Sequence, residues 1–400
     1  MSLKCDLGKR LLTDMILAAK GSDPAIVLVV DEHTSRVLSS ALRMFDIMEA
    51  GVLVLQNLMK TREKLPDMPA IYFIDPTNEC INRLIADFPE GGVSGAAVAK
   101  ATKKTPICNY LNAHVFFTTH VPASGMALLK GAPSLMKKIK SFVELNVDFL
   151  AFESRIFLFD QPHTIRDLYF PTDAQRLSHT LSAISKPLVS LCITCQELPY
   201  VRYSSIGKSG ICKGLASFFD IDMKKTISLL PNWKPNESRE RGTLLIVDRS
   251  MDPIAPLMHE FTFQAMVNDL LQVDGEIAHM PLDTTGPNTN GLPKTKTDLE
   301  NEEAASELVL AEDDNLWIDF RHKHIGLVMQ NVTAKFREFK GVNKMVHTQT
   351  HIHTLFSTVQ SNAMHEVTVL TRPLSLPVLF SVFLSDRLCC SKTIRHPSRE

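Results

Sequence analysis

The stretch that decides the fold is GTLLIVDRSMDPIAPLMHEFTFQAMVNDLL, residues 242–271. Residues 243–247 form a short, mostly apolar and β-branched run, which predicts a buried strand. Two prolines hold the next residues out of a helix, and from Leu257 the apolar positions recur at helical spacing. A strand, a polar turn and a helix in this order form half of a βα unit. Because such units build parallel sheets, the stretch predicts an α/β protein.

The predicted strand ends at Asp248, and Asp31 stands in the same position after the apolar run 25–30. Sites in α/β proteins usually lie at the carboxyl ends of strands. Two interpretations stay open: a phosphohydrolase or phosphotransferase with an aspartyl nucleophile, or a scaffold whose strand-end acids cap turns. The enzyme requires a second acid and a lysine in fixed positions. Neither DEHT nor DRSMDP has an acid two residues after its first Asp, which favours the capping role.

Two further patterns imitate binding sites. Gly207-Lys208-Ser209 resembles the end of a phosphate-binding loop, but Arg202 stands where that loop requires a glycine. Cys192-x-x-Cys195 has neither a second pair nor a nearby His to complete a zinc site, so we interpret these residues as small buried residues of a strand. We therefore predict no catalytic residues, no cofactor and no metal ligands.

The amino-acid sequences of two stretches help to decide between the enzyme and the scaffold. LLIVDRSMDPIAPLMHEFTFQAMVNDLL, residues 244–271, and DDNLWIDFRHKHI, residues 313–325, closely resemble the core signature of the Sec/Munc (SM) family of syntaxin-binding proteins. The wording HEFTFQAM resembles the exocytic, plasma-membrane branch. The resemblance runs from about Ile26 to about Lys340. It implies a C-terminally truncated chain with a non-homologous tail.

The composition argues against several classes of protein. With 43 Lys and Arg against 44 Asp and Glu in 400 residues, nothing marks the chain as a binder of nucleic acid or of anionic membranes. The apolar run at 374–384 is too short and too interrupted to span a bilayer, and no signal peptide is recognisable. Eight scattered Cys suit reduced thiols, so we predict a cytoplasmic protein.

Strands and helices alternate over the first 145 residues or so, which predicts a doubly wound parallel sheet. The expected strands are 25–30, 52–55, 71–74 and 114–118, and the expected helices are 7–19, 35–49, 78–88 and 135–145. The helix at 35–49 should bury one stripe that includes Phe45 and Met48, while Arg36 and Arg43 project together from its other face.

Further along, 149–159 predicts strands of a second sheet, and 181–195 and 207–219 are helical or extended. The polar composition of residues 274–314 predicts a mobile loop. From Ile325 on, apolar residues recur every three or four positions, which predicts an amphipathic helix. We expect four regions: a first α/β domain at 1–147, an incomplete second α/β domain at 148–241, the first part of a third domain at 242–340, and a disordered, non-homologous tail at 341–400.

The resemblance implies an arch-shaped multidomain α/β protein. Its first two domains would contain doubly wound parallel sheets, and its third domain would be an α/β domain rich in helix, incomplete here. Since the strands that usually complete the second sheet are not recognisable, the strand at 243–247 should expose an edge.

The same resemblance implies a non-enzymatic regulator of SNARE assembly in vesicle docking and fusion. Its partners would be syntaxin, as a helical bundle and through its N-terminal peptide, and the assembled SNARE complex. The chain would reach the plasma membrane or vesicles only through syntaxin. The alternatives are the phosphate-transferring enzyme or a truncated product without binding function.

The partner-binding residues also come from the resemblance. Those implied for the first-domain contact surface are Asp31, Arg36, Arg43, Lys60 and Glu63. Gln56 replaces an acid that is usual beside them. Those implied for the N-terminal peptide are Met126, where an aromatic is usual, Ile139 and Glu144, and Arg321 is implied as a contact in the third domain. Charge alone would allow the first set to be an ordinary solvated face, and the apolar pattern alone would place the second set in helix cores.

Overall fold

The computed structural model describes residues 2–21, 23–100, 105–205, 210–274, 277–279, 307–310, 314–342 and 383–384. They form two compact units that divide between Met251 and Asp252, and the short strand β13 (Phe383–Leu384) belongs to the first unit. The predicted Gly-Lys-Ser step at 207–209 lies outside the described residues, as do most of 274–314 and nearly all of 341–400.

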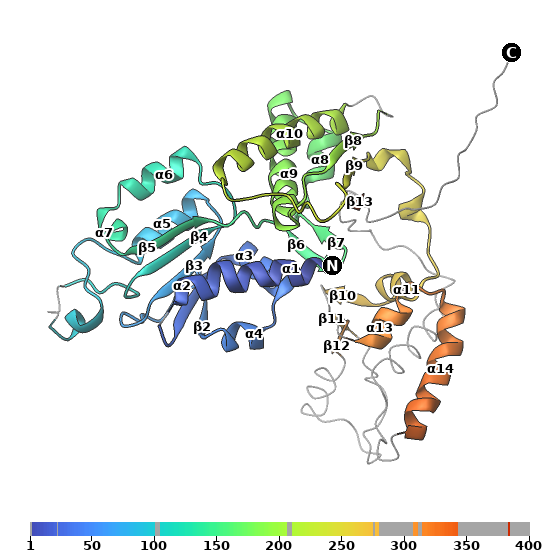
Figure 1. Ribbon diagram of the computed structural model, residues 1–400, viewed down its shortest axis with the longest axis horizontal. Helices are drawn as coiled ribbons and strands as arrows, with labels where there is room; N and C mark the ends of the chain where they lie inside the picture. The colour runs from blue at the N-terminus through green and yellow to red at the C-terminus, as the bar shows by residue number, and fades with distance from the viewer. Residues whose placement is uncertain are drawn as a thin grey trace. The chain divides into compact units, whose positions relative to one another are not determined.

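A five-stranded parallel sheet organises the start of the first unit (Figure 1). Its strands, in the spatial order β2-β1-β3-β4-β5, are β2 (Val52–Asn57), β1 (Ile26–Val30), β3 (Ala70–Ile74), β4 (Ala113–Phe117) and β5 (Ile139–Glu144). Strands β1 and β3 are buried along their whole length, as expected of strands covered on both faces. Because all five run the same way, their carboxyl ends meet at one edge of the sheet.

Alternate residues of these strands point into two different cores. Leu28 and Phe73 belong to the core packed under α1 (Leu3–Arg10), α3 (Glu32–Ala41) and α4 (Met44–Glu49). Val29 and Tyr72 belong to the core packed under the helices of the other face, which are α5 (Asn78–Ala86), α6 (Ala123–Lys130) and α7 (Pro133–Met136). Helices on both faces of a parallel sheet confirm the predicted doubly wound α/β fold (Figure 1).

The N-terminal helix begins earlier than the pattern predicts. It runs through α1, a π-helical stretch (Leu11–Leu17) and α2 (Ala18–Lys20) without a break in helical hydrogen bonding. Leu7, Leu11 and Met15 recur every four residues and are fully buried, so this face covers one side of the sheet.

The single helix predicted at 35–49 is wrong. Leu42 adopts an extended conformation that separates α3 from α4, and the Asp46 side chain accepts the backbone N–H of Arg43 at 3.1 Å. A side chain that caps a new helix competes with continuation of the old one. After the break, Phe45 and Met48 are 72% and 57% exposed instead of buried.

The helix predicted at 135–145 is also wrong. Only α7 is helical there, and the chain then forms β5, which pairs in parallel with β4 at the edge of the sheet. Pairing with an existing strand outweighs a weak local helical period. Lys140 of β5 is exposed, which suits an edge strand, where a charged side chain can remain in water.

The rest of the first unit contains helices and two small sheets. Strands β6 (Leu150–Glu153) and β7 (Ile156–Leu158) form a separate antiparallel hairpin, not part of the second sheet as predicted. The signature strand, β9 (Thr243–Ile246), is confirmed and pairs in parallel with β8 (Tyr200–Tyr203). Strand β13 pairs with its other edge at Leu244 and Leu245, so the expected exposed edge is covered there.

Three helices cover this part of the unit: α8 (Thr164–Tyr169), α9 (Ala174–Thr194) and α10 (Ile211–Leu229). Cys192 and Cys195 are buried and free, as predicted, but they lie in and directly after α9, not in a strand. The core under α1 is continuous with buried residues of α9, α10 and β9, so it extends across the boundary predicted at residue 147. The division into four regions stays a prediction.

The second unit packs around Phe263, Trp317, Phe320 and Val328. Its elements are α11 (Phe263–Leu270), β10 (Gln272–Asp274), β11 (Ile277–His279), β12 (Glu307–Val309), α13 (Asn315–Phe320) and α14 (Ile325–Val342). The amphipathic helix predicted after Ile325 is confirmed as α14. The helix predicted from Leu257 begins only at Phe263, because the residues after Asp248 form two 3₁₀ turns (Arg249–Met251 and Ala255–Leu257).

Candidate partner-binding surface

Asp31 is not an exposed contact residue. Only 4% of it is exposed, and its carboxylate accepts the backbone N–H of Thr34 at 2.8 Å and that of Asp75 at 2.7 Å. The side chain therefore caps α3 and joins the ends of β1 and β3, the role that the capping interpretation gives to strand-end acids. Asp31 orients α3, and the helix presents other residues to solvent.

Arg36 lies one turn into α3, and its side chain is exposed. Its guanidinium forms an ion pair with Asp160, which follows β7. This pair fixes the direction of a long side chain that would otherwise sample many rotamers. The Arg36 side chain is therefore already ordered before a partner binds, so binding costs less of its conformational entropy.

Arg43 does not project with Arg36 from one helix, because the break at Leu42 lies between them. It is exposed at the start of α4. Three apolar side chains of α4, Met44, Phe45 and Met48, are exposed beside it in the sequence. The break thus places a cationic residue and exposed apolar area on the same short helix.

Lys60 and Glu63 lie in the loop after β2, and both are exposed. Arg62 anchors this loop: its guanidinium donates to both carboxylate oxygens of Asp87, at 2.8 and 3.0 Å, and the two side chains are only 8% and 5% exposed. Tyr72 and Asn109 also donate to Asp87, so the buried carboxylate is well satisfied.

Gln56, which stands where the SM resemblance implies an acid, lies at the end of β2. Its amide donates to the Glu63 carbonyl oxygen at 3.3 Å and accepts the hydroxyl of Tyr110. It therefore holds the loop from inside instead of offering a charge to a partner.

The three residues implied for the N-terminal peptide lie on two elements. Met126 is half-buried in α6, whereas Ile139 and Glu144 begin and end β5. The alternative that places all three residues in helices is therefore correct only for Met126. Met126 and Ile139 pack against the same core. The Glu144 carboxylate pairs with His120 at 2.9 Å and accepts the backbone N–H of Val121 at 3.0 Å, which ties β5 to the segment before α6.

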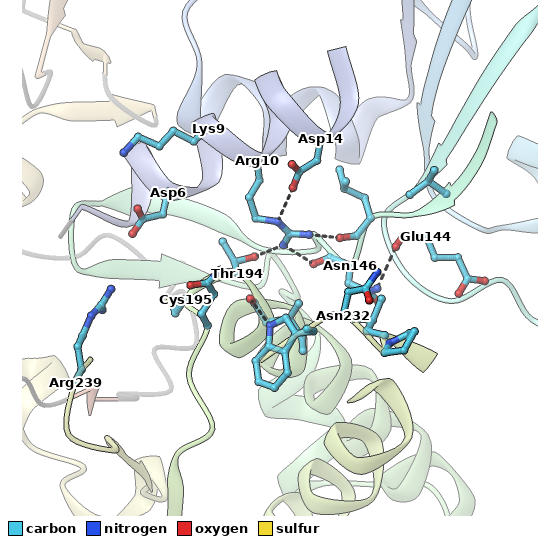
Figure 2. Close-up of a pocket in the computed structure, with 17 residues that line it drawn as sticks. Asp6, Lys9, Arg10, Asp14, Glu144, Asn146, Thr194, Cys195, Asn232 and Arg239 are labelled. Carbon is cyan, nitrogen blue, oxygen red and sulfur yellow. Dashed lines mark hydrogen bonds and ion pairs between the residues drawn. The ribbon is translucent and has the colours of Figure 1, made fainter. Parts of the chain in front are cut away.

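Glu144 also lines a cavity of about 530 Å³ at the end of β5 (Figure 2). Arg10 of α1 reaches this cavity and donates to the carbonyl oxygens of Leu145 and Asn146 and to the hydroxyl of Thr194. Arg10 thereby joins the N-terminal helix, the end of β5 and α9. The cavity belongs to the first unit, and neither Met126 nor Ile139 lines it.

Arg321 follows α13 in the second unit and is only 9% exposed, so it is not a surface charge. Its carbonyl oxygen accepts the backbone N–H of Gln264 at 3.0 Å, and its own N–H donates to Trp317. The residue links α13 to α11. A direct partner contact through its side chain would require that side chain to move outward.

Asp248, like Asp31, is a buried strand-end acid that caps the turn after its strand. It is 6% exposed and accepts hydrogen bonds from the Tyr169 hydroxyl and from the backbone and hydroxyl of Ser250. Burial, together with the hydrogen bond to Asp248, raises the pKa of Tyr169 to about 12. The carboxylate closes the turn after β9, in agreement with the capping interpretation.

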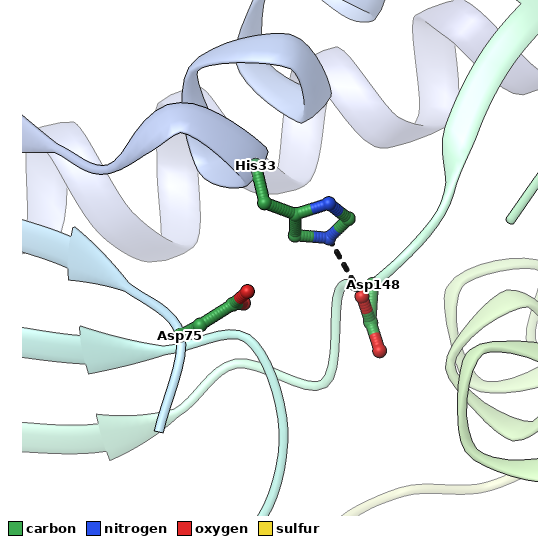
Figure 3. Close-up of side chains that lie close together, drawn as sticks. All are labelled: His33, Asp75 and Asp148. Carbon is green, nitrogen blue, oxygen red and sulfur yellow. Dashed lines mark hydrogen bonds and ion pairs between the residues drawn. The ribbon is translucent and has the colours of Figure 1, made fainter. Parts of the chain in front are cut away.

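Sequence reasoning missed a polar cluster at the carboxyl edge of the five-stranded sheet. His33 Nε2 lies 2.8 Å from Asp148 Oδ1, and Asp75 lies beside both residues (Figure 3). Burial alone would lower the pKa of His33, but the hydrogen bond to Asp148 and the neighbouring negative charges raise it to about 9. Burial raises the pKa of Asp75 to about 6.

We expect the free energy of unfolding to fall as the pH rises from about 6.5 to about 9. In this window the folded imidazole keeps a proton that the unfolded one has lost, so its stabilisation is complete below 6.5 and is lost by about 9. The slope should reach up to about 1.4 kcal/mol per pH unit. Denaturant titrations of the native chain and His33→Gln across the window measure it. The variant should show the flatter profile, and equal slopes would contradict the assignment.

Comparison with known proteins identifies the family. The model of the Sec1 family matches residues 26–367, which is most of the chain. The chain belongs to the Sec1 family. The match extends past Lys340, where we place the end of the recognisable resemblance, and includes residues 341–367.

Curated Sec1-type proteins from two organisms resemble this Sec1-family chain. It is 34% identical over 348 residues to protein transport protein sec1 of Dictyostelium discoideum, covering 86% of this chain and 52% of that protein. It is 29% identical over 354 residues to the SNARE-interacting protein KEULE of Arabidopsis thaliana, covering 85% and 49%. The chain thus spans about half the length of the curated relatives that it matches.

Solved structures agree with the Sec1-family assignment. The chain resembles Unc18 in the Unc18–syntaxin 1 complex of Monosiga brevicollis with a TM-score of 0.69 and 28% identity, covering 92% of this chain and 60% of that one. It shares the fold of Sly1p, solved with an N-terminal peptide of Sed5p, with a TM-score of 0.64 and 20% identity over 90% of this chain and 58% of that one. Among the helices that the structure describes, none combines the length and apolarity needed to cross a bilayer.

Proposed function

We propose that this Sec1-family chain binds a syntaxin-type SNARE and regulates SNARE assembly in vesicle docking and fusion. The observation that carries the proposal is the likeness to Unc18 from a complex with syntaxin 1, which covers 92% of this chain. The proposed contact surface consists of Arg36, Arg43, Lys60 and Glu63. The cytoplasmic region of a syntaxin is the ligand to test first.

The proposed surface has the physical features that such a task requires. Arg36 is held by Asp160, and the loop of Lys60 and Glu63 is held by Arg62, so these charges sit on a rigid support. Charged residues of this kind steer and orient a partner, whereas apolar anchors supply most of the affinity. The exposed apolar side chains of α4 offer such anchors directly after Arg43.

The direct test is calorimetric titration of the full chain with the cytoplasmic region of a syntaxin. Saturable binding, confirmed by co-elution in size-exclusion chromatography, is the expected result. The absence of both binding heat and co-elution with every syntaxin tested would contradict the proposal. The charge reversal that assigns the binding to this surface is described in the Discussion.

We also infer a second contact, in which Met126, Ile139 and Glu144 receive the extended N-terminal peptide of syntaxin. The shared core beneath Met126 and Ile139 supports it, since both side chains are half-buried and retain some accessible area. The His120–Glu144 pair offers a polar boundary at the end of β5. This contact is independent of α4, which packs on the opposite face of the sheet.

Met126→Ala should weaken binding of a free syntaxin N-terminal peptide by about 1–2 kcal/mol, because about one side chain of apolar area would be lost. Met126→Phe should keep or improve the affinity, since a ring offers a larger apolar contact. Fluorescence anisotropy with a labelled peptide measures both variants. Equal affinity of the native chain and both variants would place the peptide elsewhere.

We infer that the chain works by binding and not by catalysis. Both strand-end acids that an aspartyl mechanism would use, Asp31 and Asp248, are buried and occupied as caps. Magnesium-dependent turnover of a phosphate ester that disappears in Asp248→Asn would contradict this inference. In the same proposal, syntaxin recruits the chain to the cytoplasmic face of the plasma membrane or of vesicles.

A further inference from the structure

The geometry points to a metal-binding site formed by His33, Asp75 and Asp148 (Figure 3). The site would hold one divalent ion of a first-row transition metal, such as zinc. Each residue offers one donor atom, and the three atoms all lie within 4.8 Å of one another. This distance lets one ion, with bonds of about 2.0–2.2 Å, contact a ligand atom from each residue after small side-chain adjustments.

The three ligands come from separate elements that the sheet holds together. His33 lies in the first turn of α3 directly after β1, and Asp75 directly follows β3. Strands β1 and β3 are paired up to Val30 and Phe73, so their ends are side by side. Asp148 follows Val147, whose backbone N–H donates to the Thr118 carbonyl oxygen at 2.8 Å, beyond β4. The sheet therefore positions all three residues without a ligand.

Second-layer contacts orient Asp75. The Thr118 hydroxyl donates to Asp75 Oδ1 at 2.6 Å, and the Asp75 backbone N–H donates to Asp31 at 2.7 Å. Hydrogen bonds of this kind fix ligand geometry in metal sites. His33 Nε2 and Asp148 Oδ1 already face each other at 2.8 Å, so a cation would replace this hydrogen bond.

A cavity of about 530 Å³ adjoins the cluster and is lined by Asp75 and Asp148, together with Thr118 and Asn146. The three ligand side chains are half-buried, so an ion can enter from solvent through this cavity. Water in the cavity can fill the remaining coordination positions, as in sites with three protein ligands and one open position.

The donor set selects the class of cation. One imidazole nitrogen and two carboxylate oxygens suit zinc, cobalt and manganese, whereas calcium and magnesium prefer oxygen donors only. Two carboxylates also balance the charge of a divalent ion. A bound ion would tie the start of α3, which carries Arg36, to β3 and to the segment after β5.

Cobalt(II) is the probe for the experiment, because its visible absorption reports coordination by protein ligands. The chelator-treated full chain is titrated with cobalt, and zinc is then added as a competitor. The native chain should bind one cobalt ion. His33→Gln and the nearly isosteric Asp148→Asn should each bind at least about tenfold more weakly. The control is His259→Gln, because His259 forms an exposed pair with Asp269 at 3.0 Å and belongs to no three-ligand cluster among the described residues.

Folding of each variant is checked by its melting curve in chelator. Should His33→Gln fail to fold, Asp148→Asn and a zinc-dependent rise in the Tm of the native chain still decide the matter. Cobalt bands in the native chain and in His259→Gln, with loss in the ligand variants, support the site. No cobalt bands in the native chain, or equal titrations of all four proteins, would overturn it.

Discussion

Arg43→Glu is expected to weaken binding of the cytoplasmic region of a cognate syntaxin by about 2–5 kcal/mol, if Arg43 meets an acid in a partly desolvated interface. Reversal both removes an attraction and places a like charge opposite the partner acid. Arg43 stands exposed at the start of α4, so the substitution leaves the core unchanged. Isothermal titration calorimetry with a syntaxin fragment that lacks its N-terminal peptide isolates this surface.

Arg83→Glu is the matched control. Arg83 is an exposed arginine on α5, which packs on the opposite face of the same sheet. Both variants change the net charge equally, so long-range effects should be similar in the two. Loss of affinity confined to Arg43→Glu supports the surface. Unchanged affinity in a folded Arg43→Glu, or equal losses in both variants, would remove Arg43 from it.

Arg62→Ala is expected to destabilise the first unit by about 3–5 kcal/mol, because it leaves the buried Asp87 carboxylate without its cationic partner. Tyr72 and Asn109 would still donate to Asp87 but would not neutralise it. The loop that carries Lys60 and Glu63 should also loosen. Denaturant titration measures the stability, and amide hydrogen exchange at residues 60–64 measures the loop.

Arg176→Ala provides the comparison for Arg62→Ala. Arg176 pairs with Asp167 at 2.9 Å, but its side chain is 53% exposed, so solvent screens the pair and its removal should destabilise the protein far less than removal of Arg62. Equal losses in the two variants would show that burial of the Arg62–Asp87 pair does not matter. A stable Arg62→Ala with unchanged exchange in the loop would remove the anchoring role.

The sequence was most informative where both faces of a strand are buried. The runs at 26–30 and 70–74 are apolar throughout, because every side chain enters one of two cores. Strand β5 could not be recognised in the same way, since it lies at the edge and mixes Lys140, Ser141 and Glu144 with apolar residues. Its identity depends on pairing with β4, which a local pattern does not contain.

The candidate surface was predictable as a set of charges but not as a geometry. The position of the break between α3 and α4 depends on the cap that Asp46 provides, and it decides that Phe45 and Met48 face solvent. The burial of Asp31 depends on its hydrogen bonds to Thr34 and Asp75. His33, Asp75 and Asp148 are far apart in the sequence, so only the order of the parallel strands brings them together.

The core that extends past residue 147 has a consequence for synthesis on the ribosome. The core under α1 also includes buried residues of α9, α10 and β9, so it is complete only when these elements have emerged, roughly 100 residues after β5. At about 5–20 residues per second, the apolar residues that these later elements cover would stay exposed on the nascent chain for roughly 5–20 s. During this interval the N-terminal segment is a natural client for chaperones that bind nascent chains.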